Sequence, residues 1–152
     1  MTQPESFSLD HRKVAAPYIR IAEVRPLKSG GVVTKFDIRF HQPNAGHLPM
    51  PTIHSIEHML ATFLRDHSED VIDISPMGCQ TGFYIAVDGE FTTEEMAELL
   101  QAAMGDLVRA TEVPAANETQ CGWAASHSLD GAKAAVQEFL DARATWHTVF
   151  AS

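Results

Sequence analysis

The segment 32–41 constrains the fold most, because apolar and charged side chains alternate along it. Successive side chains of a β-strand point to opposite faces of a sheet. One face of this strand would be apolar and the other polar, which is typical of an antiparallel sheet with a core on one side only. The apolar set is Thr34, Phe36, Ile38 and Phe40, and the polar set is Lys35, Asp37, Arg39 and His41.

Further strands and helices are expected around this segment. Thr92 and Glu95 form a capping-box pattern that opens a helix, and Thr52, at the end of a proline-rich loop, is a plausible N-cap for another helix. Hairpin strands covered by helices on one face give an α+β fold, a single domain over residues 1–152. The expected strands are 18–25, 32–41, 71–74 and 83–87, and the expected helices begin near residue 53, at residue 93 (to about 110) and at residue 129 (to about 143).

Two histidines in the segment HSIEH are candidate metal ligands. His54 and His58 would lie about 40° apart on one helix face, so both imidazoles can bind one ion. Glu57 would lie about 60° to the other side of His54, beside the metal without having to be a ligand. Such a pair also occurs on solvated helix faces without a metal. The order H-x-x-E-H is in addition the signature of inverted-motif zinc peptidases, which stay an alternative.

The chain has only two cysteines, and both lie in loop-like segments next to glycine. A catalytic zinc-type site usually has three protein ligands and an open position, so a thiolate of Cys79 or Cys121 could join the two histidines. A disulfide between them, or two buried structural thiols, are the alternatives. The N-terminus has no secretory signal, which favours a cytoplasmic protein with reduced thiols.

Four segments stand out in order along nearly the whole chain: 5–11 (ESFSLDH), 54–58 (HSIEH), 75–84 (SPMGCQTGFY) and 114–122 (PAANETQCG). Together they resemble the S-ribosylhomocysteine lyase (LuxS) family. This resemblance implies that His54, His58 and Cys121 hold one divalent metal ion, Fe²⁺ in the cell with Zn²⁺ or Co²⁺ as substitutes. It also implies that Cys79 is a catalytic acid and base rather than a ligand.

The reaction that the resemblance implies cleaves S-ribosylhomocysteine to homocysteine and 4,5-dihydroxy-2,3-pentanedione, the precursor of the quorum-sensing signal autoinducer-2. The sugar carbonyl migrates twice through enediolates before homocysteine leaves by β-elimination. Each step removes a proton next to a carbonyl that a metal can polarise. Glu57 and Cys79 are the candidate proton carriers. A base at Cys79 needs a lowered thiol pKa, and Arg39, in the family's R-F-x-Q-P-N pattern, is expected to supply the positive charge.

By resemblance, four residues are expected to bind the substrate: Arg39, Ser6, His11 and Asp73. Ser6 and His11 would reach the ribosyl hydroxyls from the other subunit of a homodimer, which places the active sites at the interface. Asp73 matches a family position next to the homocysteine moiety. Without the resemblance, Ser6 would be a tail residue and His11 a surface or capping residue.

Composition excludes some classes of function. A formal net charge of −9 argues against nucleic acid as a partner, because phosphates call for a basic surface. No run of about 20 apolar residues exists that could span a membrane. Beside the lyase, two hypotheses stay open: a small inverted-motif peptidase, and a non-enzymatic metal-binding module in which Glu57 and Cys79 have no role.

Overall fold

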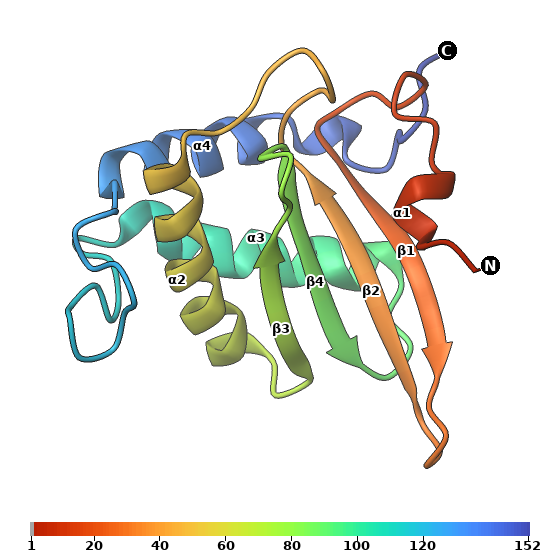
Figure 1. Ribbon diagram of the computed structural model, residues 1–152, viewed down its shortest axis with the longest axis horizontal. Coiled ribbons are helices and arrows are strands. Elements are labelled where there is room, and N and C mark those ends of the chain that lie inside the picture. Colours follow the sequence, from red (N-terminus) through yellow and green to blue (C-terminus); the bar gives the residue numbers. More distant parts are fainter. Residues whose placement is uncertain (1) are drawn as a thin grey trace.

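The computed structural model describes residues 2–152, and its centre is a four-stranded antiparallel sheet (Figure 1). The strands lie in the order β1-β2-β4-β3. Each lies within two residues of the bounds predicted from the sequence, because the alternating segments and their turns are strong local signals. The strands are β1 (Tyr18–Pro26), β2 (Val32–Arg39), β3 (Val71–Pro76) and β4 (Gly82–Asp88).

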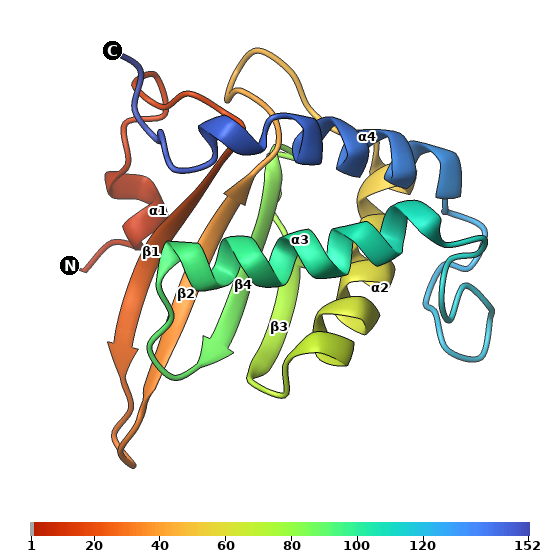
Figure 2. The same cartoon turned by 180° about the vertical axis from the view of Figure 1, so that it is seen from behind.

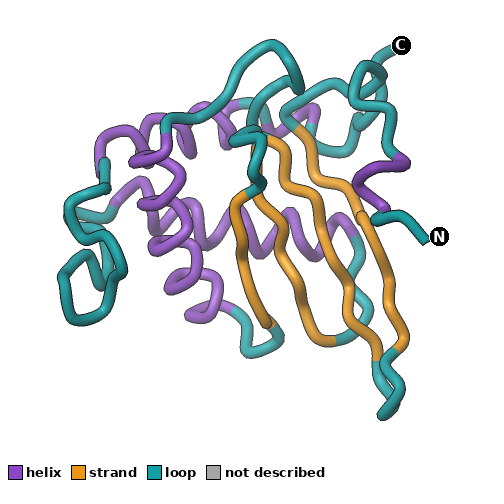
Figure 3. Tube along the Cα trace, viewed as in Figure 1, coloured by secondary structure: helices purple, strands orange, loops and turns teal. Residues whose placement is uncertain are grey.

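Three long helices complete the α+β fold and lie on the side of the apolar face of the sheet. α3 crosses behind the strands with α4 beside it, as Figure 2 shows from that side, and α2 contacts the edge strand β3. The tube in Figure 3 shows the same separation of helices from strands. The predicted capping box at Thr92 and Glu95 is present at the start of α3. The helices are α2 (Met50–His67), α3 (Thr93–Arg109) and α4 (Leu129–Asp141), followed by a short 3₁₀ turn, Arg143–Thr145.

The core lies between this face and the helices, as the alternation predicted. Phe36 and Ile38 of β2 are buried there beside Phe83 and Ile85 of β4. α2 contributes an apolar stripe at helical spacing, which leaves its other side free for chemistry. The stripe consists of Ile53, Ile56, Met59, Leu60 and Leu64.

The opposite face of the sheet carries a short helix that the sequence did not predict, α1 (Glu5–Ser8). Glu5 forms an ion pair with Arg20 of β1, and Arg20 also pairs with Asp37 of β2. The side chains of Asp37 and Arg39 are only 0% and 1% exposed. The polar face is therefore partly buried and holds a network of charges.

The prediction that Thr52 caps α2 is wrong. The helix begins at Met50, its N-cap residue is Pro49, and no side chain caps it. Proline is tolerated in the first turn of a helix, where its missing N–H would have no intrahelical partner. Thr52 is instead buried, and its hydroxyl lies so close to Gly131 of α4 that a Cβ on residue 131 would collide with it. The glycine thus allows α4 and the start of α2 to approach closely.

Between residues 2 and 152, no helix combines the length and apolar character that crossing a membrane requires.

Candidate metal centre and thiol pocket

Four potential ligand atoms come together where α2 meets the loop before α4. They belong to His54 and His58 of α2 and to Cys121 and His127 of that loop, and all lie within 4.8 Å of one another. Two imidazole nitrogens and a thiolate suit Zn²⁺, Fe²⁺ or Co²⁺ and disfavour Mg²⁺ or Ca²⁺. The residues present therefore fit a transition-metal ion, as the H-x-x-E-H spacing predicted.

The rings of His54 and His58 are oriented for binding through Nε2. Their Nδ1 atoms each lie 2.8 Å from a backbone oxygen, of Ser126 and Pro114 respectively. A carbonyl oxygen only accepts, so each Nδ1 carries the hydrogen and each Nε2 lone pair is free for a metal. Such hydrogen bonds are the usual support of metal-binding histidines.

The loop that carries Cys121 is held by its own hydrogen bonds. The side-chain oxygen of Asn117 accepts from the amides of Thr119 and Gln120, at 3.1 and 3.0 Å. The Asn117 carbonyl accepts from the Cys121 amide at 2.9 Å. These contacts turn the chain so that Cys121 Sγ lies 3.4 Å from His54 Nε2. Cys121 joins the two histidines, as the family resemblance implied.

His127 is the member of the cluster that the sequence reasoning missed. Its place six residues after Cys121 is the only local signal, and this spacing is not one of the usual short zinc-ligand spacings, C-x₂₋₄-C and H-x₃₋₅-H. Its ring stacks on that of His54, with centroids 3.9 Å apart. Burial first, and then the neighbouring imidazoles of His54 and His58, lower the pKa of His127 and favour its neutral form.

The hydrogen bonds of His127 differ from those of His54 and His58. Its Nδ1 lies 3.0 Å from the hydroxyl of Ser55, which already accepts the amide hydrogen of Ser128 at 2.8 Å. The hydroxyl hydrogen of Ser55 is then available to His127 Nδ1. This arrangement favours the tautomer of His127 that carries its hydrogen on Nε2, 3.6 Å from Cys121 Sγ. In that tautomer His127 would donate a hydrogen bond to the Cys121 thiolate and would not be a fourth metal ligand.

Glu57 lies next to this cluster, as predicted. It is half-buried and lines a hollow of about 270 Å³ together with His58, Pro114 and Ala115. A carboxylate at this position borders the metal ligands and is open to a small molecule that enters the hollow. The geometry suits a group that takes up or gives a proton.

Cys79 lies in the turn between β3 and β4, at the end of the sheet near the loop that follows β2. The turn is closed by hydrogen bonds from Met77 N to Gly82 O and from Gln80 N to Met77 O, both 2.9 Å. Any Cβ on Gly82 would collide with the backbone of Ile38 in β2. Glycine at this position therefore lets the turn pack against β2, while Cys79 itself is exposed.

Among the described residues, the side-chain hydrogen bonds of Arg39 go to Asp37 and Thr81 and not to Cys79. Its guanidinium donates to both carboxylate oxygens of Asp37, at 3.0 and 2.9 Å, and to Thr81 Oγ1 at 3.0 Å. Burial opposes the charge of Arg39, but the hydrogen bonds and charge of Asp37 outweigh it and raise its pKa. Thr81 Oγ1 in turn lies 2.9 Å from Cys79 Sγ.

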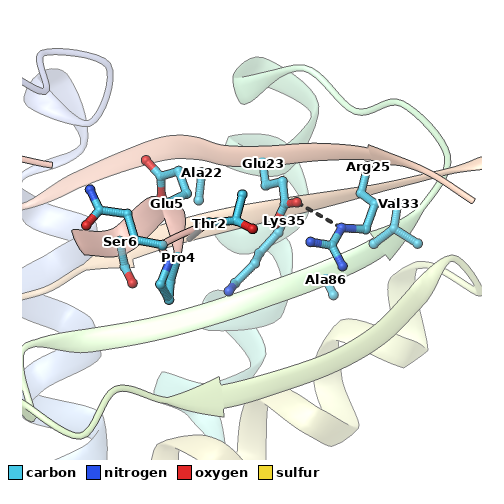
Figure 4. A pocket seen from close by; sticks show the side chains of 11 residues that line it. Thr2, Pro4, Glu5, Ser6, Ala22, Glu23, Arg25, Val33, Lys35 and Ala86 are labelled. Carbon is cyan, nitrogen blue, oxygen red and sulfur yellow. Dashed lines mark hydrogen bonds and ion pairs between the residues drawn. The ribbon is translucent and has the colours of Figure 1, made fainter. Parts of the chain in front are cut away.

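The remaining predicted substrate residues lie in separate hollows. His11 lines a pocket of about 670 Å³ with Arg39 and Cys79 of the same chain. Ser6 borders a hollow over the open face of the sheet (Figure 4). Asp73 is exposed and borders a third hollow with Lys35, Ser75 and Tyr84.

Within the described residues of one chain, the metal cluster and the pocket of Cys79 share no residue. Glu57 and His58 line one hollow, and Cys79, Arg39 and His11 line another. The placement of Ser6 and His11 in the site of a second subunit stays a prediction. The roles of Glu57, Cys79, Arg39 and Asp73 also stay predictions.

Comparisons with known proteins find close relatives. The model of the LuxS family, S-ribosylhomocysteinase, matches residues 4–150. Two proteins of Staphylococcus aureus, from strains JH9 and Newman, are named S-ribosylhomocysteine lyase and are each 53% identical to the chain over 146 residues. The alignment covers 96% of this chain and 94% of each relative.

Proposed function

This chain belongs to the LuxS family of S-ribosylhomocysteinases, and from that membership we propose that it is a metal-dependent S-ribosylhomocysteine lyase. Its products are homocysteine and 4,5-dihydroxy-2,3-pentanedione, the autoinducer-2 precursor, so that it also recycles a by-product of the methyl cycle. The observation that carries the proposal is the cluster of His54, His58 and Cys121, with Glu57 beside it, in a chain more than half identical to named lyases.

His54, His58 and Cys121 hold the metal, and Fe²⁺ is the ion in the cell. A divalent ion bound there supplies Lewis-acid polarisation of the sugar carbonyl, and three protein ligands leave a position open. The Nδ1 hydrogen bonds of His54 and His58 to backbone carbonyls keep both rings in the binding orientation. Both rings would therefore offer Nε2 to one ion.

Glu57 and Cys79 carry the protons. The carbonyl moves from C1 to C2 and then to C3, so a proton must be taken from one carbon and returned to its neighbour at each step. Cys79 serves the sugar carbons and Glu57 serves the later transfers that end in elimination of homocysteine. Their separate hollows support two carriers with different placement.

The active enzyme is a homodimer with its sites at the interface, and it works in the cytoplasm, where both thiols stay reduced. Ser6 and His11 of one subunit bind the ribosyl hydroxyls in the site of the other, Arg39 supports Cys79 and the substrate, and Asp73 borders the homocysteine moiety. The separation of the metal cluster from the Cys79 pocket within one chain supports a site that two chains complete.

One experiment separates this proposal from the other hypotheses. The metal-loaded protein is incubated with S-ribosylhomocysteine and a thiol-detecting reagent, and with an unrelated peptide as a second substrate. The lyase releases homocysteine thiol and leaves the peptide intact. Peptide cleavage without thiol release would support the inverted-motif peptidase, and neither product would leave a metal-binding module.

A further inference from the structure

The geometry points to Thr81 as a positioning residue that donates a hydrogen bond to the sulfur of Cys79 and holds it as a reactive thiolate. This inference rests on the proposed function, in which Cys79 carries protons. It assigns to a buried threonine the direct link between Cys79 and the charge of Arg39.

The direction of the hydrogen bond follows from what each group can donate. The guanidinium of Arg39 has donors only, so in its 3.0 Å contact with Thr81 Oγ1 the hydroxyl oxygen accepts. The hydroxyl keeps one hydrogen of its own. Its other side-chain partner is Cys79 Sγ, 2.9 Å away. A thiolate has no hydrogen to donate, so with Cys79 in this form Thr81 donates and the sulfur accepts. Hydrogen bonds to a charged acceptor are stronger than neutral ones, which favours the thiolate.

The link is fixed at both ends. The side chain of Thr81 is almost fully buried, at 3% exposure, and its carbonyl accepts from the amides of Phe40 and His41, at 2.8 and 3.0 Å. Arg39 is held in turn by both oxygens of Asp37. Because this donor is already held in place, little reorganisation is needed when the sulfur becomes charged.

Other groups that face Cys79 are few among the described residues. His11 and His47 line the same pocket, as does Arg39. The positive charge of Arg39 also acts on the sulfur through space, and the hydroxyl of Thr81 is the group that joins the two by hydrogen bonds. Cooperative strengthening along such a chain is expected in a buried setting.

The test uses the resting, metal-loaded protein without substrate. The rate of alkylation of Cys79 by iodoacetamide is followed by mass spectrometry across pH, since bound metal protects Cys121. We expect Thr81→Val to slow alkylation near neutral pH about tenfold, because a hydrogen bond to a charged group is lost, while the limiting rate at high pH does not fall. Thr81→Ser keeps the hydroxyl and should stay within about twofold of the unmodified rate.

Thr81→Ala is the second variant without a hydroxyl, and it should behave like Thr81→Val. Metal content and circular dichroism identify any variant that does not fold. A neutral-pH rate in both Thr81→Val and Thr81→Ala equal to that of the unmodified protein overturns the inference, as does a Thr81→Ser rate as slow as theirs. The proposed function fails separately, if the unmodified metal-loaded protein releases no homocysteine, and the role of Cys79 fails if Cys79→Ala releases it at the unmodified rate.

Discussion

The two cysteines lie in similar loop segments of the sequence, but their side chains have different neighbours. Cys121 Sγ lies 3.4 Å from His54 Nε2 in the metal cluster, and Cys79 Sγ contacts Thr81. We therefore expect Cys121→Ala to lose most of its metal, since one of three ligands is removed. Cys79→Ala should keep the full metal content. Elemental analysis of the purified variants measures both.

His127 provides a control for the number of ligands. If its Nε2 carries a hydrogen, His127→Ala leaves three ligands and retains the metal, and the visible spectrum of the Co²⁺ form keeps the band intensities of the unmodified coordination number. Metal loss from His127→Ala equal to that from Cys121→Ala would make His127 a fourth ligand. Equal loss from Cys79→Ala and Cys121→Ala would show that the roles of the cysteines have been misassigned.

The role of Glu57 can be tested by removing only its ability to take up a proton. Glu57→Gln keeps the shape of a side chain beside His58 in its hollow. We expect this variant, with metal bound, to form a 2-keto or 3-keto sugar and to release homocysteine on the order of 10²–10⁴ times more slowly. Substrate labelled with ¹³C at C2 and C3 of the ribose, followed by NMR, would show the ketone signals.

Cys79→Ala is the matched control for Glu57→Gln, because it should stop at or before the first carbonyl migration and show no ketone. Homocysteine release by Glu57→Gln at the unmodified rate would remove Glu57 from the mechanism. It would then be a helix carboxylate on the surface of α2.

The sequence predicted single residues well where the signal was local and less well where it depended on distant contacts. The H-x-x-E-H spacing identified His54 and His58, and their union with Cys121 is confirmed. Asp37 was predicted to lie on a polar strand face, but it is fully buried, because Tyr18, Arg20 and Arg39 pair with it. Arg39 shares the strand face of Asp37, as the alternation predicted, but Tyr18 and Arg20 come from β1 and no local pattern indicates that pairing.

The contact between α2 and α4 supports the metal centre at the scale of secondary structure. Gly131 in the first turn of α4 lies against Thr52 of α2, and α2 carries His54 and His58. We expect Gly131→Ala to lower the free energy of unfolding by about 1–3 kcal/mol, because the added methyl overpacks this contact. Denaturant titration at fixed protein concentration measures the change.

Gly105→Ala in α3 is the matched control. A Cβ there would meet only the flexible end of Arg109, at 3.5 Å, so the higher helix propensity of alanine should stabilise the protein by about 0.5–1 kcal/mol. Adding Thr52→Ala to Gly131→Ala should restore part of the lost stability. No loss in Gly131→Ala would show that the two helices separate at little cost.

The elements themselves were predictable because their signals agree. Alternation fixed β2, and Thr92 with Glu95 fixed the start of α3. The predicted start of α2 is too late, because a proline-rich segment is typical of a loop, although Pro49 is the N-cap residue and the first helical turn accepts Pro51. α1 has only four residues, too few for a periodic pattern, and its pairing with Arg20 is a tertiary contact.

For the whole molecule, the central question is how the separate hollows form one active site. The metal ligands and Glu57 belong to α2 and the Cys121 loop, while His11, Arg39 and Cys79 surround another pocket. A sequence motif identifies each group but carries no information on the distance between them. Two chains related by a two-fold axis can bring the pocket of one to the metal of the other.

Mixed dimers test this arrangement. His11→Ala and Glu57→Gln should each be inactive alone, but a mixed dimer has one site that contains both native residues if His11 acts across the interface. Random assortment makes about half of the dimers mixed, each with one intact site of two, so co-refolding should return about a quarter of the unmodified activity. Homocysteine release measures it, with the mixed dimers confirmed by mass.

As a matched control, His11→Ala with Cys79→Ala should recover nothing, because both residues line one pocket of one chain. No recovery in the first mixture would place His11 outside the site of the second subunit, and recovery in the control would show that His11 and Cys79 of one chain serve different sites.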